Sequence, residues 1–215
     1  MHKKKPFLIT FEGIEGSGKS YQSKKLYKNL IKNRFKVILT REPGGTFNAE
    51  RIRKLILKDY FQKKLNKQFD KYTDTLLYLA ARNEHIKNKI IPALKKSKIV
   101  ICDRFIDSTM AYQVYGKGVN INLINSIHKI ILKKISPDLT FIIKCNINSA
   151  IKRMNKRKTK NRYDKFSKKF YNNVQNAFIR IGKKNKKRYI IVDNSINDKS
   201  SEIKIINSVI KKFKK

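Results

Sequence analysis

The chain has 215 residues, a length that suits one domain or one domain with a small lid. Hydrophobic residues make up 40% of it, which is too many for a disordered chain, and no apolar run approaches the roughly 20 residues that span a bilayer. The formal net charge of +38 would attract nucleic acid or anionic lipid without any specific site.

Five short apolar runs alternate with longer stretches in which apolar residues recur at helical spacing. Strands separated by helices of this length imply parallel βαβ units and a sheet covered on both faces. In chain order, strands are predicted at residues 7–11, 37–40, 99–102, 139–143 and 189–192. Helices are predicted at residues 19–33, 48–58, 70–95 with a break near Pro92, 120–135 and 200–213.

A phosphate-binding loop follows the first strand. Residues 13–20 read G-I-E-G-S-G-K-S, and a strand before and a helix after are the context that supports a P-loop. Backbone N–H groups of such a loop surround phosphates, and the helix N-terminus adds partial positive charge. Lys19 is expected to bridge the β- and γ-phosphates, and Ser20 to ligate Mg²⁺. The residues expected to bind ATP here are Gly13, Ile14, Glu15, Gly16, Ser17, Gly18, Lys19 and Ser20.

Charged side chains follow the next two predicted strands. Arg41 comes after the second strand, and Asp103 and Arg104 come after the third. Ligands of open α/β sheets bind at the carboxyl ends of the strands, so we expect these side chains to face the P-loop. Two guanidinium groups there favour an anion, and Asp103 takes a Walker-B-like position near Mg²⁺.

Together, five segments resemble thymidylate kinase in content and order, from Phe7 to about Val192. They are 13–20, 41–46 (R-E-P-G-G-T), 77–82 (L-Y-L-A-A-R), 103–113 (D-R-F-I-D-S-T-M-A-Y-Q) and 137–140 (P-D-L-T). The resemblance implies a P-loop NTPase-type, three-layer α/β/α fold with a five-stranded parallel sheet and a small helical lid. It also implies a single nucleoside monophosphate kinase domain over 1–215, with the lid at about 152–164.

The resemblance implies ATP-dependent phosphorylation of thymidine monophosphate (dTMP) to dTDP in dTTP synthesis, with Mg²⁺, in a cytoplasmic homodimer. Arg41, Arg53 and Arg104 resemble the clamp on the acceptor phosphate. Glu15 resembles the carboxylate that meets the deoxyribose 3′-hydroxyl, and Arg153 the arginine that stacks on adenine. No specific nucleic-acid partner and no membrane partner are expected.

The resemblance also implies a base pocket. Tyr78 falls where the family stacks an aromatic ring on thymine, and Arg82, four residues on, would contact the base edge. Tyr112 would pack against the sugar where a ribose 2′-hydroxyl would intrude. The polar groups of the base would be read by Ser108, Thr109 and Gln113. Each residue also has an ordinary structural interpretation, such as core packing for Tyr78 and helix capping for Ser108.

A basic stretch over 152–163 is predicted to be the lid. The P-loop carries no arginine, which resembles a subtype that supplies transition-state arginines from the lid. Arg157 and Arg162 are the candidates, because arginine is scarce in this chain. An acceptor phosphate has a second pKa near 6, so no general base is expected. The expected catalytic set is Lys19, Arg104, Glu15, Arg157 and Arg162.

Three alternatives remain open from the sequence. A deoxynucleoside kinase would share the P-loop but needs a carboxylate base, and another nucleoside monophosphate kinase would lack the S-T-x-x-Y-Q run at 108–113. A nucleic-acid-binding protein would use the net charge, although 42 Lys, 31 Ile and 20 Asn, all with A- and T-rich codons, favour genome composition as its cause. Cys102 and Cys145 are expected to be buried, reduced thiols rather than a disulfide framework or a metal site.

Overall fold

The computed structural model describes residues 6–58, 68–156, 162–196 and 198–213. Its centre is a five-stranded sheet with the order β2-β3-β1-β4-β5, in which every pair of neighbouring strands is parallel. All five predicted strands are present, each one residue longer at its carboxyl end. The strands are β1 (Phe7–Glu12), β2 (Val37–Arg41), β3 (Ile99–Asp103), β4 (Leu139–Lys144) and β5 (Tyr189–Asp193).

Helices connect the strands in the described ranges. The α-helices are α1 (Lys19–Lys32), α2 (Phe47–Lys58), α3 (Lys71–His85), α4 (Ile91–Lys95), α5 (Ile106–Thr109), α6 (Ile121–Leu132), α7 (Ile147–Asn155), α8 (Lys168–Lys184) and α9 (Ser200–Phe213). The π-helices are η1 (Ile86–Ile90) and η2 (Met110–Gly116), and a 3-10 turn, η3, covers Arg162–Lys165. The break predicted near Pro92 is the π-helix η1, which runs directly into α4 with Pro92 in its first turn.

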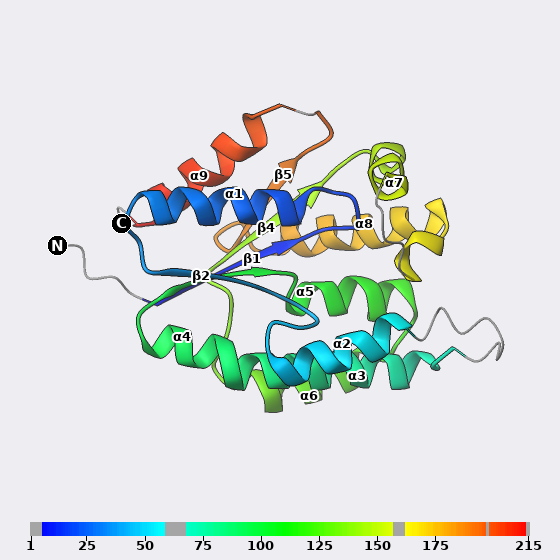
Figure 1. Ribbon diagram of the computed structural model, residues 1–215. Helices are drawn as coiled ribbons and strands as arrows, with labels where there is room; N and C mark the ends of the chain where they lie inside the picture. The colour runs from blue at the N-terminus through cyan, green and yellow to red at the C-terminus, as the bar shows by residue number, and fades with distance from the viewer. Residues whose placement is uncertain (1–5, 59–67, 157–161, 197, 214–215) are drawn as a thin grey trace.

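The strands are buried on both faces because alternate residues enter different cores. Ile9 and Phe11 of β1 pack with residues of α1 and α9 on one face, whereas Leu8 packs with η1 on the other. Further along that second face, Ile142 of β4 packs with Phe178 of α8. Figure 1 shows the layers, with α1 and α9 above the sheet and α2 to α6 below it. This is the predicted three-layer arrangement.

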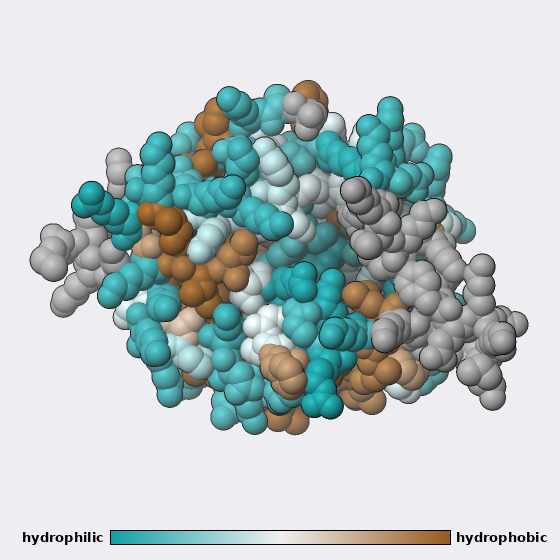
Figure 2. All heavy atoms as spheres, in the orientation of Figure 1, coloured by the Kyte–Doolittle hydropathy of each residue, from teal (hydrophilic) through white to brown (hydrophobic). Residues whose placement is uncertain are grey.

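The sequence analysis did not predict α7 and α8. Helix α8 buries residues at helical spacing, namely Tyr171, Val174, Phe178 and Ile181, but these lie among Lys and Asn residues that hide the pattern. The expected lid at about 152–164 includes 157–161, which lie outside the described residues. No helix in the described ranges is long and apolar enough to cross a membrane. Hydrophilic side chains cover most of the face seen in Figure 2, and apolar ones gather in a few patches.

Candidate active site

The P-loop connects β1 to α1 as predicted. Gly16 and Gly18 have φ angles of 73° and 96°, in the left-handed region that favours glycine. A Cβ at Gly16 would lie 2.3 Å from the carbonyl oxygen of Ala150 in α7, so the loop also packs too closely for a side chain. Lys19 starts α1, is 7% exposed and donates from Nζ to the carbonyl oxygen of Ile14 at 3.2 Å. Its ammonium is thereby held against the loop.

Asn194, which follows β5, secures the other side of the loop and was missed from the sequence. Its Nδ2 donates to the carbonyl oxygen of Ser17 at 2.8 Å, and its Oδ1 accepts from Gln22 at 3.2 Å. Arg153 of α7 donates to the carbonyl oxygens of Gly16 and Asn194, at 3.3 and 3.2 Å. The sequence offered only one indication of this role for Asn194, namely its position directly after the carboxyl end of β5, the strand beside β4.

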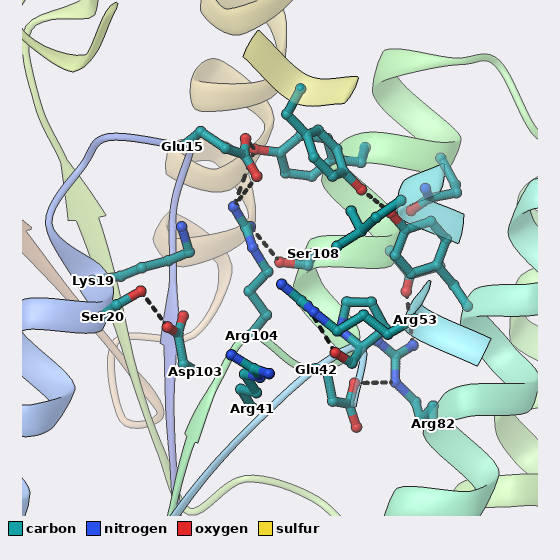
Figure 3. Close-up of a pocket in the computed structure, with 17 residues that line it drawn as sticks. Glu15, Lys19, Ser20, Arg41, Glu42, Arg53, Arg82, Asp103, Arg104 and Ser108 are labelled. Carbon is teal, nitrogen blue, oxygen red and sulfur yellow. Dashed lines mark hydrogen bonds and ion pairs between the residues drawn. The ribbon is translucent and has the colours of Figure 1, made fainter. Parts of the chain in front are cut away.

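Ser20 and Asp103 come together at the junction of β3 and α1. The Ser20 hydroxyl donates to Oδ2 of Asp103 (Figure 3). The other carboxylate oxygen, Oδ1, is buried and has no hydrogen-bond partner among the described residues. A hydroxyl and an unsatisfied carboxylate oxygen are the hard donors that Mg²⁺ prefers, so this pair fits the predicted metal site.

Four arginines line one cavity of about 340 Å³ beside the P-loop, and three of them lie toward the carboxyl edge of the sheet. Arg41 ends β2, Arg104 follows β3, and Arg53 lies in α2, where Nη1 donates to the carbonyl oxygen of Pro43 at 2.8 Å. Burial, together with the nearby positive charges of Arg41 and Arg104, lowers the pKa of Arg53. Part of this charge is offset, since Glu50 accepts from Arg41 at 3.1 Å. Crowded cations at the carboxyl edge of the sheet are the charge distribution that an anion would require.

Glu15 holds Arg104 on the P-loop side of the cavity (Figure 3), and Tyr112 contacts both residues. Nη2 of Arg104 lies 2.5 Å from Glu15, the Tyr112 hydroxyl donates to the same carboxylate, and the guanidinium lies 5.1 Å from the Tyr112 ring centroid. Burial opposes ionisation of Glu15, but the charges of Arg104 and Lys19 and the hydrogen bond from Tyr112 together outweigh it and lower the pKa of Glu15. Arg104 also donates to Ser108 at 3.0 Å and has a φ of 72°. Such backbone strain is typical of functional positions.

Arg82 lies in the wall of the same cavity and is 3% exposed. Nε donates to Glu42 at 2.7 Å, and Nη2 donates to the carbonyl oxygen of Phe105 at 2.9 Å. Nη1 donates to Thr109 at 2.7 Å and to His128 at 2.9 Å. Burial and the Arg82 charge lower the pKa of His128 to about 3, so its ring is neutral and accepts. Four of the five N–H groups of Arg82 therefore have acceptors among the described residues.

A second buried contact fixes Glu42. His85 bridges Glu42 Oε1 at 3.0 Å and the Thr40 hydroxyl at 2.7 Å through its two ring nitrogens. Burial raises the pKa of Glu42, but Arg82 and His85 outweigh it and the pKa is lowered overall. Glu42, His85 and Cys102 are close enough for a common metal, yet both ring nitrogens of His85 already have partners. We therefore interpret this group as a hydrogen-bonded support for Arg82.

A family model described as thymidylate kinase matches residues 11–204. The chain belongs to the thymidylate kinase family. A thymidylate kinase from Wolbachia pipientis subsp. Culex pipiens (strain wPip) is 43% identical over 210 residues, which are 96% of this chain and 97% of that protein. One from Mycoplasma capricolum subsp. capricolum is 41% identical over 86% of this chain and 85% of its own length. These relatives confirm the predicted enzyme class.

The crystal structure of thymidylate kinase from Ehrlichia chaffeensis superposes with a TM-score of 0.74 at 36% identity. It covers 96% of this chain, and this chain covers 99% of it. This likeness confirms the predicted P-loop NTPase-type α/β fold.

The cavity brings together all ten residues predicted to bind dTMP. The cavity is lined by Glu15, Arg41, Arg53, Tyr78, Arg82, Arg104, Ser108, Thr109, Tyr112 and Gln113, with Lys19, Ser20 and Asp103 at its P-loop end. Glu42, Pro43, Leu57 and Tyr163 line it too and were not predicted. Tyr163 is the only aromatic residue between 152 and 165, which is the signal that could have marked it.

Of the two arginines predicted to act from the lid, the structure describes only Arg162. Arg157 lies outside the described residues. Arg162 is 5% exposed, does not line the cavity, and pairs with Asp74 of α3 at 2.5 Å. The neighbouring Tyr163 reaches the cavity, where its hydroxyl contacts that of Tyr78. In this thymidylate kinase family member, Tyr163, in the segment predicted to be a lid, thus belongs to the wall of the cavity.

Proposed function

We propose that this chain transfers the γ-phosphoryl group of ATP to dTMP, giving ADP and dTDP for dTTP synthesis. The observation that carries the proposal is the cavity that joins a P-loop to three arginines and a partly satisfied base-edge arginine. A phosphate donor and a phosphate acceptor both require positive charge, and the two groups of cations meet there (Figure 3). Membership of the thymidylate kinase family supports the choice of acceptor.

On the donor side, the P-loop backbone and Lys19 would hold the β- and γ-phosphates of ATP. Arg153 is held by Gly16 and Asn194 beside the loop, which supports its place against adenine. Ser20 and Asp103 would hold Mg²⁺ through the hydroxyl and the unsatisfied carboxylate oxygen. When bound, the ion would neutralise phosphate charge.

On the acceptor side, Arg41, Arg53 and Arg104 would clamp the dTMP phosphate. Two of the three already have counter-charges, Glu50 for Arg41 and Glu15 for Arg104, which orient the guanidinium groups before a ligand arrives. Glu15 is ionised and would accept from the deoxyribose 3′-hydroxyl. A phosphate monoester with a second pKa near 6 is mostly dianionic at neutral pH, so positioning replaces a general base.

The base would lie between Tyr78 and the residues of α5 and η2. The remaining N–H of Arg82 would donate to a carbonyl oxygen of the base. Thymine and uracil carry such an oxygen, whereas an exocyclic amino group in its place could not accept this hydrogen bond. The other polar groups in reach belong to Ser108, Thr109 and Gln113. Tyr112 is held by Glu15 and is 4% exposed, which supports a rigid wall that excludes a ribose 2′-hydroxyl.

The wider context is part of the same proposal. We infer that the chain forms one nucleoside monophosphate kinase domain with a lid at about 152–164, of the subtype without an arginine in the P-loop. Arg157 is the remaining lid candidate for a cation at the transition state. A homodimer, a cytoplasmic location and the absence of a specific nucleic-acid or membrane partner follow from the family resemblance.

A coupled assay of ADP release with Mg²⁺, ATP and a panel of acceptors tests the proposal. The panel is dTMP, dUMP, dCMP, AMP and thymidine. Preference for dTMP is expected, with dUMP second, because a thymine methyl group contributes about 1–3 kcal/mol in a pocket. Phosphorylation of thymidine but not dTMP would identify a nucleoside kinase instead and remove the clamp role from the arginines.

A further inference from the structure

Asp74 is a buried carboxylate outside the acceptor cavity. It lies in the first turn of α3, is 1% exposed and does not line the cavity. Nζ of Lys117 donates to Oδ2 at 2.7 Å, and Nη2 of Arg162 lies 2.5 Å from Oδ1. Both carboxylate oxygens therefore face cations that come from distant parts of the chain.

Each partner of Asp74 is adjacent to a wall of the cavity. Asp74 is one helical turn before Tyr78, and Lys117 directly follows η2, which carries Tyr112. Arg162 immediately precedes Tyr163. Tyr78, Tyr112 and Tyr163 line the cavity, whereas Lys117 and Arg162 do not.

Arg162 extends the same connection to a fourth element. Its Nη1 donates to the carbonyl oxygen of Ile56 in α2 at 3.2 Å, next to the cavity-lining Leu57. Its guanidinium lies 5.8 Å from the ring centroid of Tyr78 and 5.5 Å from that of Tyr163. The same two tyrosines contact each other through their hydroxyl groups. Arg162 is thus surrounded by the acceptor wall.

We propose that Asp74 is a positioning residue that fixes the walls of the acceptor pocket, and that Arg162 acts with it there rather than on the transferring phosphoryl group. The inference rests on the proposed function, since it concerns how dTMP is held. Replacing Asp74 with Asn would leave two cations beside a neutral amide, and a buried pair that loses one partner is strongly destabilised. The walls would separate, and binding of the acceptor would weaken.

The pocket walls contact the acceptor equally in the ground state and the transition state. Loss of such uniform binding raises KM and leaves kcat unchanged. Asp74→Asn is therefore expected to raise the KM for dTMP about tenfold, because small misplacements of binding groups are costly. The KM for ATP and kcat should change less than about twofold, since their groups lie elsewhere.

Asp70→Asn is the matched control. Asp70 caps the same helix and is exposed, and its side chain accepts from the backbone N–H groups of Tyr72 and Thr73. The change removes the same charge four residues away, and Asn caps helices as well as Asp. All three kinetic constants should stay within about twofold of the wild type.

Two results would overturn the inference. One is a fall in kcat for Asp74→Asn with an unchanged KM for dTMP, which would place Asp74 and Arg162 in the transfer step. The other is a rise in the KM for dTMP in Asp74→Asn that is no larger than the change in Asp70→Asn. If the wild type phosphorylates another monophosphate and not dTMP, the proposed function fails, and the same comparison of KM and kcat is made with that acceptor.

Lys117→Gln decides the question if Asp74→Asn does not fold. The Lys117 side chain is 21% exposed, so replacing it disturbs the buried core less than replacing Asp74 does. A smaller rise in the KM for dTMP, about threefold, is expected because one of the two cations on Asp74 remains. An unchanged KM for dTMP in this variant would overturn the inference.

Discussion

The donor side and the acceptor side of this site are built in different ways. The P-loop is one run of eight residues, 13–20, and its shape depends on backbone geometry and on contacts such as Asn194 with Ser17. The acceptor cavity takes walls from β2, α2, α3, η2 and η3, held together by buried ion pairs such as Glu42 with Arg82. Substitutions on the donor side should therefore affect the reaction alone, and those on the acceptor side affinity and folding together.

The largest effect is expected for Lys19→Ala. Removing one preorganised cation from the transferring phosphates should lower kcat about a thousandfold, with the melting temperature close to that of the wild type. Steady-state kinetics and thermal unfolding measure the two quantities. Lys28→Ala, at an exposed position of the same helix, is the control and should leave both unchanged. Wild-type turnover by Lys19→Ala would contradict the P-loop assignment.

Arg104→Gln tests the residue at which the donor side and the acceptor side meet. The variant loses a guanidinium from the phosphate clamp and leaves Glu15 buried without its counter-charge. We expect the KM for dTMP to rise about a hundredfold and the KM for ATP by much less. Arg180→Gln, at an exposed position of α8, serves as the control. Equal increases in both KM values would show that Arg104 does not distinguish acceptor from donor.

Glu42→Gln should separate folding from chemistry on the acceptor side. The change keeps the shape of the side chain but removes the negative charge that faces Arg82, which is 3% exposed. We expect the free energy of unfolding to fall by about 2 kcal/mol, measured by urea denaturation. Glu202→Gln breaks the more exposed pair with Lys25, 3.5 Å apart, and should cost at most about 1 kcal/mol. Similar losses in the two variants would mean that burial of the Glu42 pair does not matter.

The same contrast explains what the sequence could predict. The strands and the P-loop follow from local patterns, because apolar runs and a contiguous motif carry their own geometry. Arg41 and Arg104 were placed correctly because they follow strands that end at one edge of the sheet. Glu42, His128 and Tyr163 could not be assigned, because their roles depend on partners 40 or more residues away. The pairing of Arg162 with Asp74 could not be foreseen for the same reason, since charge near a lid does not reveal a buried partner on a distant helix.

Glu12 connects the two sides and provides the smallest expected effect. It ends β1 before the P-loop and accepts from Phe105 at 2.8 Å and Ser108 at 2.6 Å, both on the acceptor side. Burial, with a smaller contribution from Asp107, raises the pKa of Glu12 from 4.5 to about 7.

Between these two pKa values of Glu12 the folded state holds a proton that the unfolded state has lost, so this group's contribution to stability falls as pH rises through that window. In the Glu12→Gln variant this side chain cannot ionise, so its contribution to stability does not decrease as the pH rises. Relative to the wild type, it should gain about 1 kcal/mol of unfolding free energy between about pH 5 and about pH 6. Urea denaturation of both proteins at these two pH values measures the gain. The difference in unfolding free energy between the wild type and Glu12→Gln stays constant with pH only if Glu12 is ionised in the folded protein throughout. Such a result would show that the donor and acceptor sides meet at a charged rather than a neutral carboxyl group.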